Sequence, residues 1–257
     1  MTPIPILALD QIQFFATSVY PCSYIEGRIA RSQVASPSDQ IDSQRYSELV
    51  QQGFRRSGGF VYRPYCDHCQ ACTSIRIPVA EFHPNRSQRR AWSRHCHLVT
   101  RIDRPHFSEE HFELYQRYQQ ARHADGGMNN DGVDQYIEFL VSSRVNSFMI
   151  EFREPDTQGF ANELRMVSII DQLGDGLSAV YTFYDPQSDQ SYGTYNVLWQ
   201  LQFAKLLRLT HLYLGYWIAA SHKMSYKANF RPHEILQHGH WTRDSEAVSS
   251  MTPFFTR

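Results

Sequence analysis

The stretch that decides the fold runs from residue 177 to residue 217 and contains LSAVYTFY (177–184), NVLWQLQFAKLLRL (196–209) and HLYLGYW (211–217). The first and last segments are apolar and rich in aromatic residues, which is typical of strands. The middle segment has apolar residues at 198, 199, 201, 203, 206 and 207, the stripe of an amphipathic helix. A strand, a helix and another strand in this order predict a mixed sheet.

The sequence before this stretch extends the pattern. Apolar segments at 147–152 and 164–170 predict two more strands, and helices are expected to begin at Ser108 and Val133. Upstream of residue 104 the chain is rich in turn residues and arginine, with short alternating segments at 59–62 and 74–79. We therefore expect an α+β protein with a β-rich, cysteine-containing subdomain at residues 1–104 and a second domain at residues 105–257.

Length and composition exclude several classes of protein. A chain of 257 residues with 42% hydrophobic residues can bury a full core, so it is neither disordered nor fibrous. It has no run of eighteen apolar residues, and residues 1–10 lack the basic and apolar parts of a secretory signal. Five cysteines, an odd number, argue against a disulfide framework. We expect a cytoplasmic protein with no membrane partner.

Three cysteines form the motif Cys66-x-x-Cys69-x-x-Cys72. This spacing suits three corners of an iron–sulfur cluster, with Cys22 as the fourth ligand. A zinc site is an alternative in which His68 replaces a cysteine, although the paired knuckles of a zinc ribbon are missing. A reduced thiol cluster without metal would have the same spacing. The motif therefore predicts that the four cysteines cluster and leaves open whether they hold a metal.

Arginine is concentrated in the same region. Residues 45–104 hold eleven arginines, no lysine and four acidic residues, a net charge of +7 in a chain whose total is −1. Arg86, Arg89, Arg90 and Arg94 have the spacing of one helical face, next to Trp92. Guanidinium groups bind phosphates in bidentate fashion, and an indole ring can stack on a base. Because few acids are available to neutralise this face, we favour phosphate binding over an ordinary solvated helix.

Two lysines and one aspartate are further candidates for chemistry. Lys223 and Lys227 are two of only three lysines, and they lie four residues apart, close to Arg231. They suit a phosphate or a developing oxyanion, but one exposed side of a helix would show the same spacing. Asp171 ends a predicted strand and lacks the turn signals of two other strand ends, so it is the better candidate for a functional carboxylate.

Motifs of several large enzyme classes are missing from the sequence. It contains no Gly-x-Ser-x-Gly elbow, P-loop, Rossmann fingerprint or His-Glu-x-x-His. These absences argue against a serine hydrolase, a nucleotide hydrolase, a dehydrogenase and a zinc protease.

Seven segments spread over nearly the whole chain resemble the aminoacyl-tRNA–protein transferases of the N-end rule pathway, above all the short bacterial members. These segments are PCSY (21–24), GFRRSG (53–58), YRPYCDHCQAC (62–72), RSQRR (86–90), DGLSAVYTFYDP (175–186), GTYNVLWQ (193–200) and YLGYWI (213–218). The resemblance implies an acetyltransferase-like (GNAT-like) fold for the C-terminal domain. It also implies transfer of an amino acid from charged tRNA to a protein N-terminus.

The short bacterial members imply leucyl-tRNA as the donor and proteins with N-terminal Asp or Glu as acceptors, the product being a degradation signal. Arginyl-tRNA is the alternative donor. An aminoacyl ester is already activated, so the transfer requires no cofactor. An iron–sulfur cluster or zinc at the cysteines would be additional to this chemistry.

Roles for individual residues are hypotheses at this stage. The catalytic candidates are Asp171, which would orient or deprotonate the α-amine, Tyr195 and Lys223. The cations available to the acidic residue of the acceptor are Arg76, Arg55 and Arg56. The candidates for tRNA binding are Arg86, Arg89, Arg90, Arg94, Trp199, Lys227 and Arg231. The candidate metal ligands are Cys22, Cys66, Cys69 and Cys72.

Two other functions remain open. A cysteine-cluster module for RNA binding or redox sensing would share the basic face and the thiol loop, although it would not account for the C-terminal resemblance. An acyl-CoA-dependent N-acetyltransferase would share the fold class, but its Gly-rich pyrophosphate loop is poorly matched.

Overall fold

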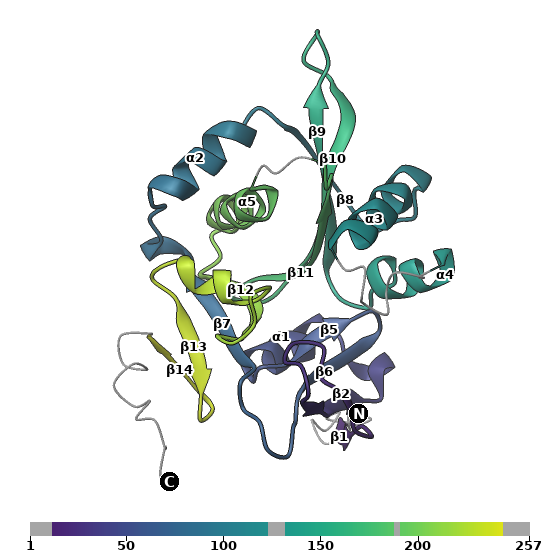
Figure 1. Cartoon of the computed structure of the whole chain (residues 1–257), viewed down its shortest axis with the longest axis vertical. Coiled ribbons are helices and arrows are strands. Elements are labelled where there is room, and N and C mark those ends of the chain that lie inside the picture. The colour runs from purple at the N-terminus through teal and green to yellow at the C-terminus, as the bar shows by residue number, and fades with distance from the viewer. Residues whose placement is uncertain (1–11, 123–131, 188–190, 244–257) are drawn as a thin grey trace, which may run out of the picture.

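The chain folds around an eight-stranded mixed sheet with helices on both faces, which confirms the α+β class (Figure 1). The computed structural model describes residues 12–122, 132–187 and 191–243. Residues 1–10, considered above as a possible signal, lie outside these ranges. Across the large sheet the strands follow the order β14-β13-β7-β12-β11-β10-β9-β8.

The predicted elements are present with small shifts in their bounds. The strands of the large sheet are β7 Thr73–Pro78, β8 Val99–Asp103, β9 Ser147–Pro155, β10 Ala161–Gln172, β11 Gly176–Tyr184, β12 His211–Trp217, β13 Glu234–Gln237 and β14 His240–Arg243. The helices are α1 Ser43–Gln51, α2 Arg86–His95, α3 Glu109–Arg122, α4 Val133–Tyr136 and α5 Tyr192–Leu206. Shorter helical turns are η2 Ser38–Gln40, η3 Val79–Glu81, η5 Ile137–Val141 and η6 Ser225–Asn229.

From β8 to β12 the elements follow the acetyltransferase-like order. Strand β8 is followed by α3 and α4, then by the antiparallel strands β9, β10 and β11. Helix α5 then connects β11 to β12, and these two strands run parallel to each other. The expectation of a GNAT-like C-terminal domain is therefore confirmed.

The helices cover the two faces of this sheet separately. Helices α2 and α5 lie on one face, and α3 and α4 lie on the other (Figure 1). Successive residues of a strand point to opposite faces, and β9 shows this clearly. Ile150 and Phe152 join the core beneath α5, whereas Met149 joins the core beneath α3.

The N-terminal part forms a smaller sheet of β1 Gln13–Ala16, β4 Ser32–Ser36, β6 Phe60–Pro64 and β5 Arg55–Ser57, with β2 Tyr20–Pro21 and β3 Ile29–Ala30 as a separate pair. Its core includes Tyr46 and Phe54 and reaches Leu173 and Tyr213 of the second half. Strand β7 enters the large sheet between β12 and β13. The large sheet thus spans the boundary expected at residue 104.

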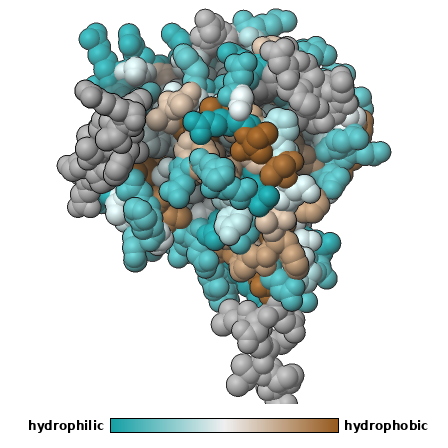
Figure 2. All heavy atoms as spheres, turned by 60° about the horizontal axis from the view of Figure 1, so that its bottom comes forward, coloured by the Kyte–Doolittle hydropathy of each residue, from teal (hydrophilic) through white to brown (hydrophobic). Residues whose placement is uncertain are grey.

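The end of the molecule that carries the small sheet has apolar side chains on its surface. Figure 2 turns this end forward and shows apolar residues grouped among hydrophilic ones. The exposed large apolar residues of the N-terminal part include Phe14, Phe15, Ile29 and Phe60. None of the helices in the described ranges has the length and apolarity needed to cross a membrane.

Candidate active site

The parallel strands β11 and β12 separate after a short paired segment, and Arg55 fills the opening. The two strands pair only between residues 176–178 and 211–213. Beyond this point, Arg55 donates from Nη1 to the Leu214 carbonyl at 3.1 Å and from Nη2 to the Ala179 carbonyl. A continuous ladder would satisfy such carbonyls with backbone N–H groups. Here a side chain from the N-terminal part supplies the donors and leaves a positive charge at the opening.

A glycine in β12 makes room for this guanidinium. Gly215 has a φ of 78°, a conformation that favours glycine, and a Cβ at this position would lie 1.1 Å from Nη1 of Arg55. The strand irregularity in β12 between Tyr213 and Gly215 is at the same place. The backbone of β12 is therefore shaped to accept Arg55.

Lys227 is a second basic side chain at this opening. It lies on η6, is 6% exposed, and donates from Nζ to the Tyr216 carbonyl at 2.7 Å. Burial, and then the charge of Arg55, hold the pKa of Lys227 well below its ordinary value of 10.5. This lowering of the pKa favours the uncharged amine, and an uncharged amine can accept a proton.

Two tyrosines, Tyr24 and Tyr62, lie near both Arg55 and the cysteines. Tyr24 lies within electrostatic range of Tyr62, Arg55, Cys72 and Cys22. Burial and then Tyr62 raise the pKa of Tyr24 to about 12, and burial also raises that of Tyr62. Both phenols are therefore protonated at neutral pH and can donate hydrogen bonds to a substrate oxygen.

The four candidate metal-ligand cysteines come from two separate segments. Cys22 follows β2, and Cys66, Cys69 and Cys72 occupy the loop between β6 and β7; all four are half-buried free thiols. Burial, followed by Cys22, Cys66 and Cys69 in that order, raises the pKa of the Cys72 thiol to about 12. Since this effect requires proximity, the structure brings Cys22 to the loop cysteines.

The four arginines predicted to bind phosphates share the exposed side of α2. Asn85 caps this helix and forms a capping box with Gln88, which fixes the start of the predicted helix at Arg86. Over the ranges that the structure describes, none of Arg86, Arg89, Arg90 and Arg94 forms an ion pair. The face therefore presents unneutralised positive charge to solvent.

Helix α2 is fastened to the segment that carries Lys227. Gln88 is 3% exposed and donates from Nε2 to the Asn229 carbonyl at 3.1 Å. Lys223 and Arg231, at either end of this segment, are exposed. Helix α2 and the η6 segment therefore lie next to each other. Lys223 lies on the surface, so of the two lysines it is Lys227 that reaches the opening.

Asp171 and Arg56 are paired with each other in the interior. Asp171 is 0% and Arg56 is 5% exposed. Arg56 donates from Nε and Nη2 to the two carboxylate oxygens at 2.9 and 2.8 Å, and the Ser147 hydroxyl donates to the same carboxylate. With their hydrogen-bonding groups turned to each other, neither residue can contact a substrate in this arrangement. The assignment of Asp171 to the α-amine and of Arg56 to the acceptor therefore fails.

Arg76 also has a carboxylate partner. Its Nε lies 2.7 Å from Oε2 of Glu234, its Nη1 donates to the Tyr213 hydroxyl, and its guanidinium lies over the Trp241 ring at 4.4 Å. An acceptor carboxylate would have to displace Glu234. Among the described residues, Arg55 is the member of the predicted trio without a carboxylate partner.

Two aromatic candidates belong to the core on the α5 face. Tyr195 is 2% exposed and packs against Trp92 and Phe152 at ring-centroid distances of 5.5 and 5.8 Å. Trp199 stacks on Phe203 and meets the edge of Phe152. These contacts explain their helical spacing, and they place Tyr195, a catalytic candidate, in the core. Reasoning from the sequence missed Tyr24 and Tyr62, although both lie within the segments that carry the family resemblance.

Comparisons with known proteins give matches over most of the chain. Two family models match, arginine-tRNA-protein transferase, N terminus, over residues 20–90 and arginine-tRNA-protein transferase, C terminus, over residues 110–237. An aspartate/glutamate leucyltransferase of Chromobacterium violaceum is 54% identical over 231 residues, which are 90% of this chain and 93% of that protein. A protein of the same name from Polynucleobacter asymbioticus is 52% identical over 242 residues, which are 94% of this chain and 98% of that protein.

Among solved structures, FemX matches with a TM-score of 0.43 and 9% identity, over 79% of each chain. The similarity to the leucyltransferases spans nearly all of both chains at more than half identical residues. The protein is therefore a member of the arginine-tRNA-protein transferase family, in its group of aspartate/glutamate leucyltransferases.

Proposed function

We propose that this protein transfers leucine from leucyl-tRNA to the N-terminal Asp or Glu of proteins and so creates a degradation signal. The relatives' names support the reaction. The structural observation that carries the proposal is the placement of the Arg55 guanidinium and the buried Lys227 amine at the opening between β11 and β12. The cytoplasm, where charged tRNA is used, is the expected compartment.

The reaction needs an amine that has lost its proton and a stabilised oxyanion. In this proposal the uncharged Lys227 accepts a proton from the acceptor's α-amine, whose unperturbed pKa is near 8. The amine nitrogen attacks the ester carbonyl of leucyl-tRNA. As the bond to the terminal ribose oxygen breaks, the nitrogen loses a second proton to that oxygen, and Lys227 then releases the first proton to water. Tyr24 and Tyr62 are the neutral donors available to the carbonyl oxygen during attack.

The acidic first residue of the acceptor needs a cation that is not already neutralised. Arg56 is paired with Asp171, and Arg76 is paired with Glu234. Arg55 donates to backbone carbonyls and retains its net charge. We therefore assign the recognition of the acceptor carboxylate to Arg55.

The tRNA acceptor end would lie along the basic side of α2 and the η6 segment. The residues proposed to contact its phosphates are Arg86, Arg89, Arg90, Arg94, Lys223 and Arg231. Gln88 fixes the distance between this surface and Lys227 through its bond to Asn229. Such a surface would place the charged end of the tRNA at the opening in the sheet.

The cysteines are proposed as the site of an iron–sulfur cluster that the transfer itself does not use. Four thiols from two segments suit a cluster with four thiolate ligands. A zinc ion held by the same thiolates is the alternative.

The experiment that tests the proposed function measures the transfer of radiolabelled leucine, and separately of arginine, from charged tRNA. The acceptors are peptides that differ only in their first residue: Asp, Glu, Lys or Ala. Leucine should move to the Asp and Glu peptides alone. Movement of arginine instead would overturn the choice of donor, and movement of neither would reject the transferase function.

A further inference from the structure

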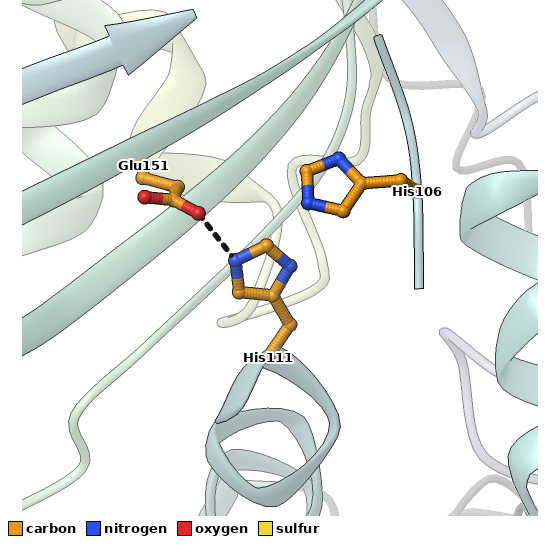
Figure 3. A group of neighbouring side chains, drawn as sticks. All are labelled: His106, His111 and Glu151. Atoms are coloured by element: carbon orange, nitrogen blue, oxygen red, sulfur yellow. Dashed lines mark hydrogen bonds and ion pairs between the residues drawn. The ribbon is translucent and has the colours of Figure 1, made fainter. Parts of the chain in front are cut away.

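A second group of functional side chains lies on the opposite face of the sheet from α2 and α5. His106, His111 and Glu151 converge between α3 and β9, as Figure 3 shows. Each offers one ligand atom, and these atoms all lie within 4.8 Å of one another. Within residues 12–122, 132–187 and 191–243, no other three His, Cys, Asp or Glu residues meet this condition.

The fold brings these three residues together from separate elements. His111 lies in the first turn of α3, and His106 lies in the connection that leads from β8 into that helix. Glu151 alternates along β9 with Ile150 and Phe152, so it points to the α3 face, as Met149 does. His111 is 0% exposed, whereas His106 lies at the surface. The group is thus anchored in the interior and open on one side.

The hydrogen bonds of the two imidazoles show which nitrogen of each ring faces the group. Nδ1 of His106 lies 3.0 Å from the Arg104 carbonyl, which can only accept, so this nitrogen donates and Nε2 keeps the lone pair. Nε2 of His111 lies 2.8 Å from Glu151 Oε1. A metal ion bound to both atoms would replace the proton between them, and the ring would then carry its proton on Nδ1, which has no other hydrogen-bond partner.

The carboxylate is held in one orientation by an arginine. Arg153 donates from Nε to Glu151 Oε2 at 2.6 Å and also pairs with Glu110. Arg101 lies opposite Glu151 in the strand register but is exposed. Because two carboxylates share the charge of Arg153, the site does not carry an excess of positive charge.

We propose that His106, His111 and Glu151 bind a divalent transition-metal ion, zinc in particular. Two imidazoles and one carboxylate are a ligand set that zinc accepts with a fourth position left for water. Magnesium and calcium prefer sites made of oxygen atoms alone. The Arg104 carbonyl and Arg153 already orient two of the ligands, which is the arrangement of partners found behind metal ligands. A bound ion would join the β8–α3 connection and the first turn of α3 to β9.

A neighbouring pair provides the matched control. Nε2 of His97 lies 2.9 Å from Glu154, also on β9, but no second histidine completes the group in the described part of the chain. His97→Ala therefore removes an exposed histidine bonded to a glutamate without touching the proposed site. His106→Ala removes the exposed ligand and leaves the buried His111 in place, so the fold is expected to persist.

The experiment adds Co²⁺ to the chelator-treated full-length protein and follows the absorption spectrum. Thiolate-bound cobalt has an intense near-ultraviolet band, so metal at the cysteines is distinguished from metal bound by nitrogen and oxygen. The wild type and His97→Ala should both bind one ion without the thiolate band. His106→Ala should lose that ion or bind it at least tenfold more weakly.

Zinc should also raise the melting temperature of the wild type and of His97→Ala. At a hundredfold excess over Kd the expected rise is about 5–10 °C, and it should be absent in His106→Ala. Two results would show that the site does not exist. In one, the wild type binds cobalt only with the thiolate band. In the other, His106→Ala binds the ion that lacks this band as tightly as the wild type does. Neither result depends on aminoacyl transfer, so this test and that of the proposed function are independent.

Discussion

At the scale of single residues, the opening between β11 and β12 depends on Arg55. In Arg55→Gln an amide remains for the backbone carbonyls, but the charge proposed to bind the acceptor is lost. Removing one partner of a desolvated charge pair costs about 3–5 kcal/mol, so kcat/KM for an Asp peptide should fall at least a hundredfold.

The affinity of Arg55→Gln for tRNA should remain within a few-fold of wild type. Arg63→Gln is the control, because Arg63 is also half-buried and lies over the Phe54 ring. An equal loss in both variants, or an unchanged kcat/KM in Arg55→Gln, would remove Arg55 from acceptor recognition.

Lys227 leads to a prediction about pH. Its pKa is well below 10.5 in the folded protein and returns to that value on unfolding. Between these two values the unfolded chain binds more protons, so the free energy of unfolding rises with pH, by about 1.4 kcal/mol per pH unit. Lys227→Met lacks this contribution. The free energy of unfolding of the wild type, relative to that of the variant, should therefore increase as the pH is raised through this window.

Urea unfolding of the two proteins at several pH values measures this difference. A difference that is constant with pH would mean that the lysine is charged in the folded state. Transfer by Lys227→Met should fall by about a hundredfold or more if the amine accepts the proton.

Asp171 supports the fold, so its substitution is expected to act on stability. Asp171→Asn leaves Arg56 as a buried charge without its carboxylate and should lower the free energy of unfolding by about 3–5 kcal/mol. The transfer rate per folded molecule should stay near that of the wild type. The double variant Arg56→Met/Asp171→Leu, which removes both charges, should recover part of the lost stability. A large loss of rate without a loss of stability would restore the catalytic assignment.

At the scale of elements, the basic side of α2 should determine how tRNA binding depends on salt. Replacing Arg86, Arg89, Arg90 and Arg94 by glutamine keeps good helix formers but removes the four charges. Each lost phosphate contact should reduce the log–log salt slope by about 0.7–0.9. Arg117→Gln, on the exposed side of α3 across the sheet, is the control. If the salt slope is unchanged in the fourfold variant, the tRNA does not bind along α2.

Helices and strands were also the features of the structure that could best be predicted from the sequence. The arginines of α2 have the spacing of one helical face, and β11, α5 and β12 followed from changes in apolar period. The pairing of Arg56 with Asp171 could not be predicted in this way, because the two residues are 115 positions apart. Trp199 and Tyr195 have the spacing of a helical stripe, and the same spacing describes a core face and a stacking face. Burial separates these two interpretations, and burial is a property of the whole fold.

At the scale of the molecule, the N-terminal part completes the second domain. Strand β7 pairs with β12 and β13 and so contributes two ladders to the large sheet. Arg55 reaches Leu214, and the Tyr216 hydroxyl donates to the Gly53 carbonyl at 2.9 Å. The cysteine loop between β6 and β7 is therefore joined directly to the strand beside the opening. The boundary near residue 104, expected from composition, could not reveal this exchange of a strand.

This exchange predicts that the chain unfolds as a single unit. A fragment of residues 105–257 would lack β7 and β8 and would leave the edges of β12 and β9 unpaired, with core residues Ile75 and Ile77 missing. We expect the whole chain to give a single urea transition that is the same by circular dichroism and by tryptophan fluorescence. The fragment should show no cooperative transition, whereas a fragment that unfolds cooperatively would establish residues 105–257 as an autonomous domain. In that case β7 would be an addition to a sheet that is already stable, and the opening could form without Arg55.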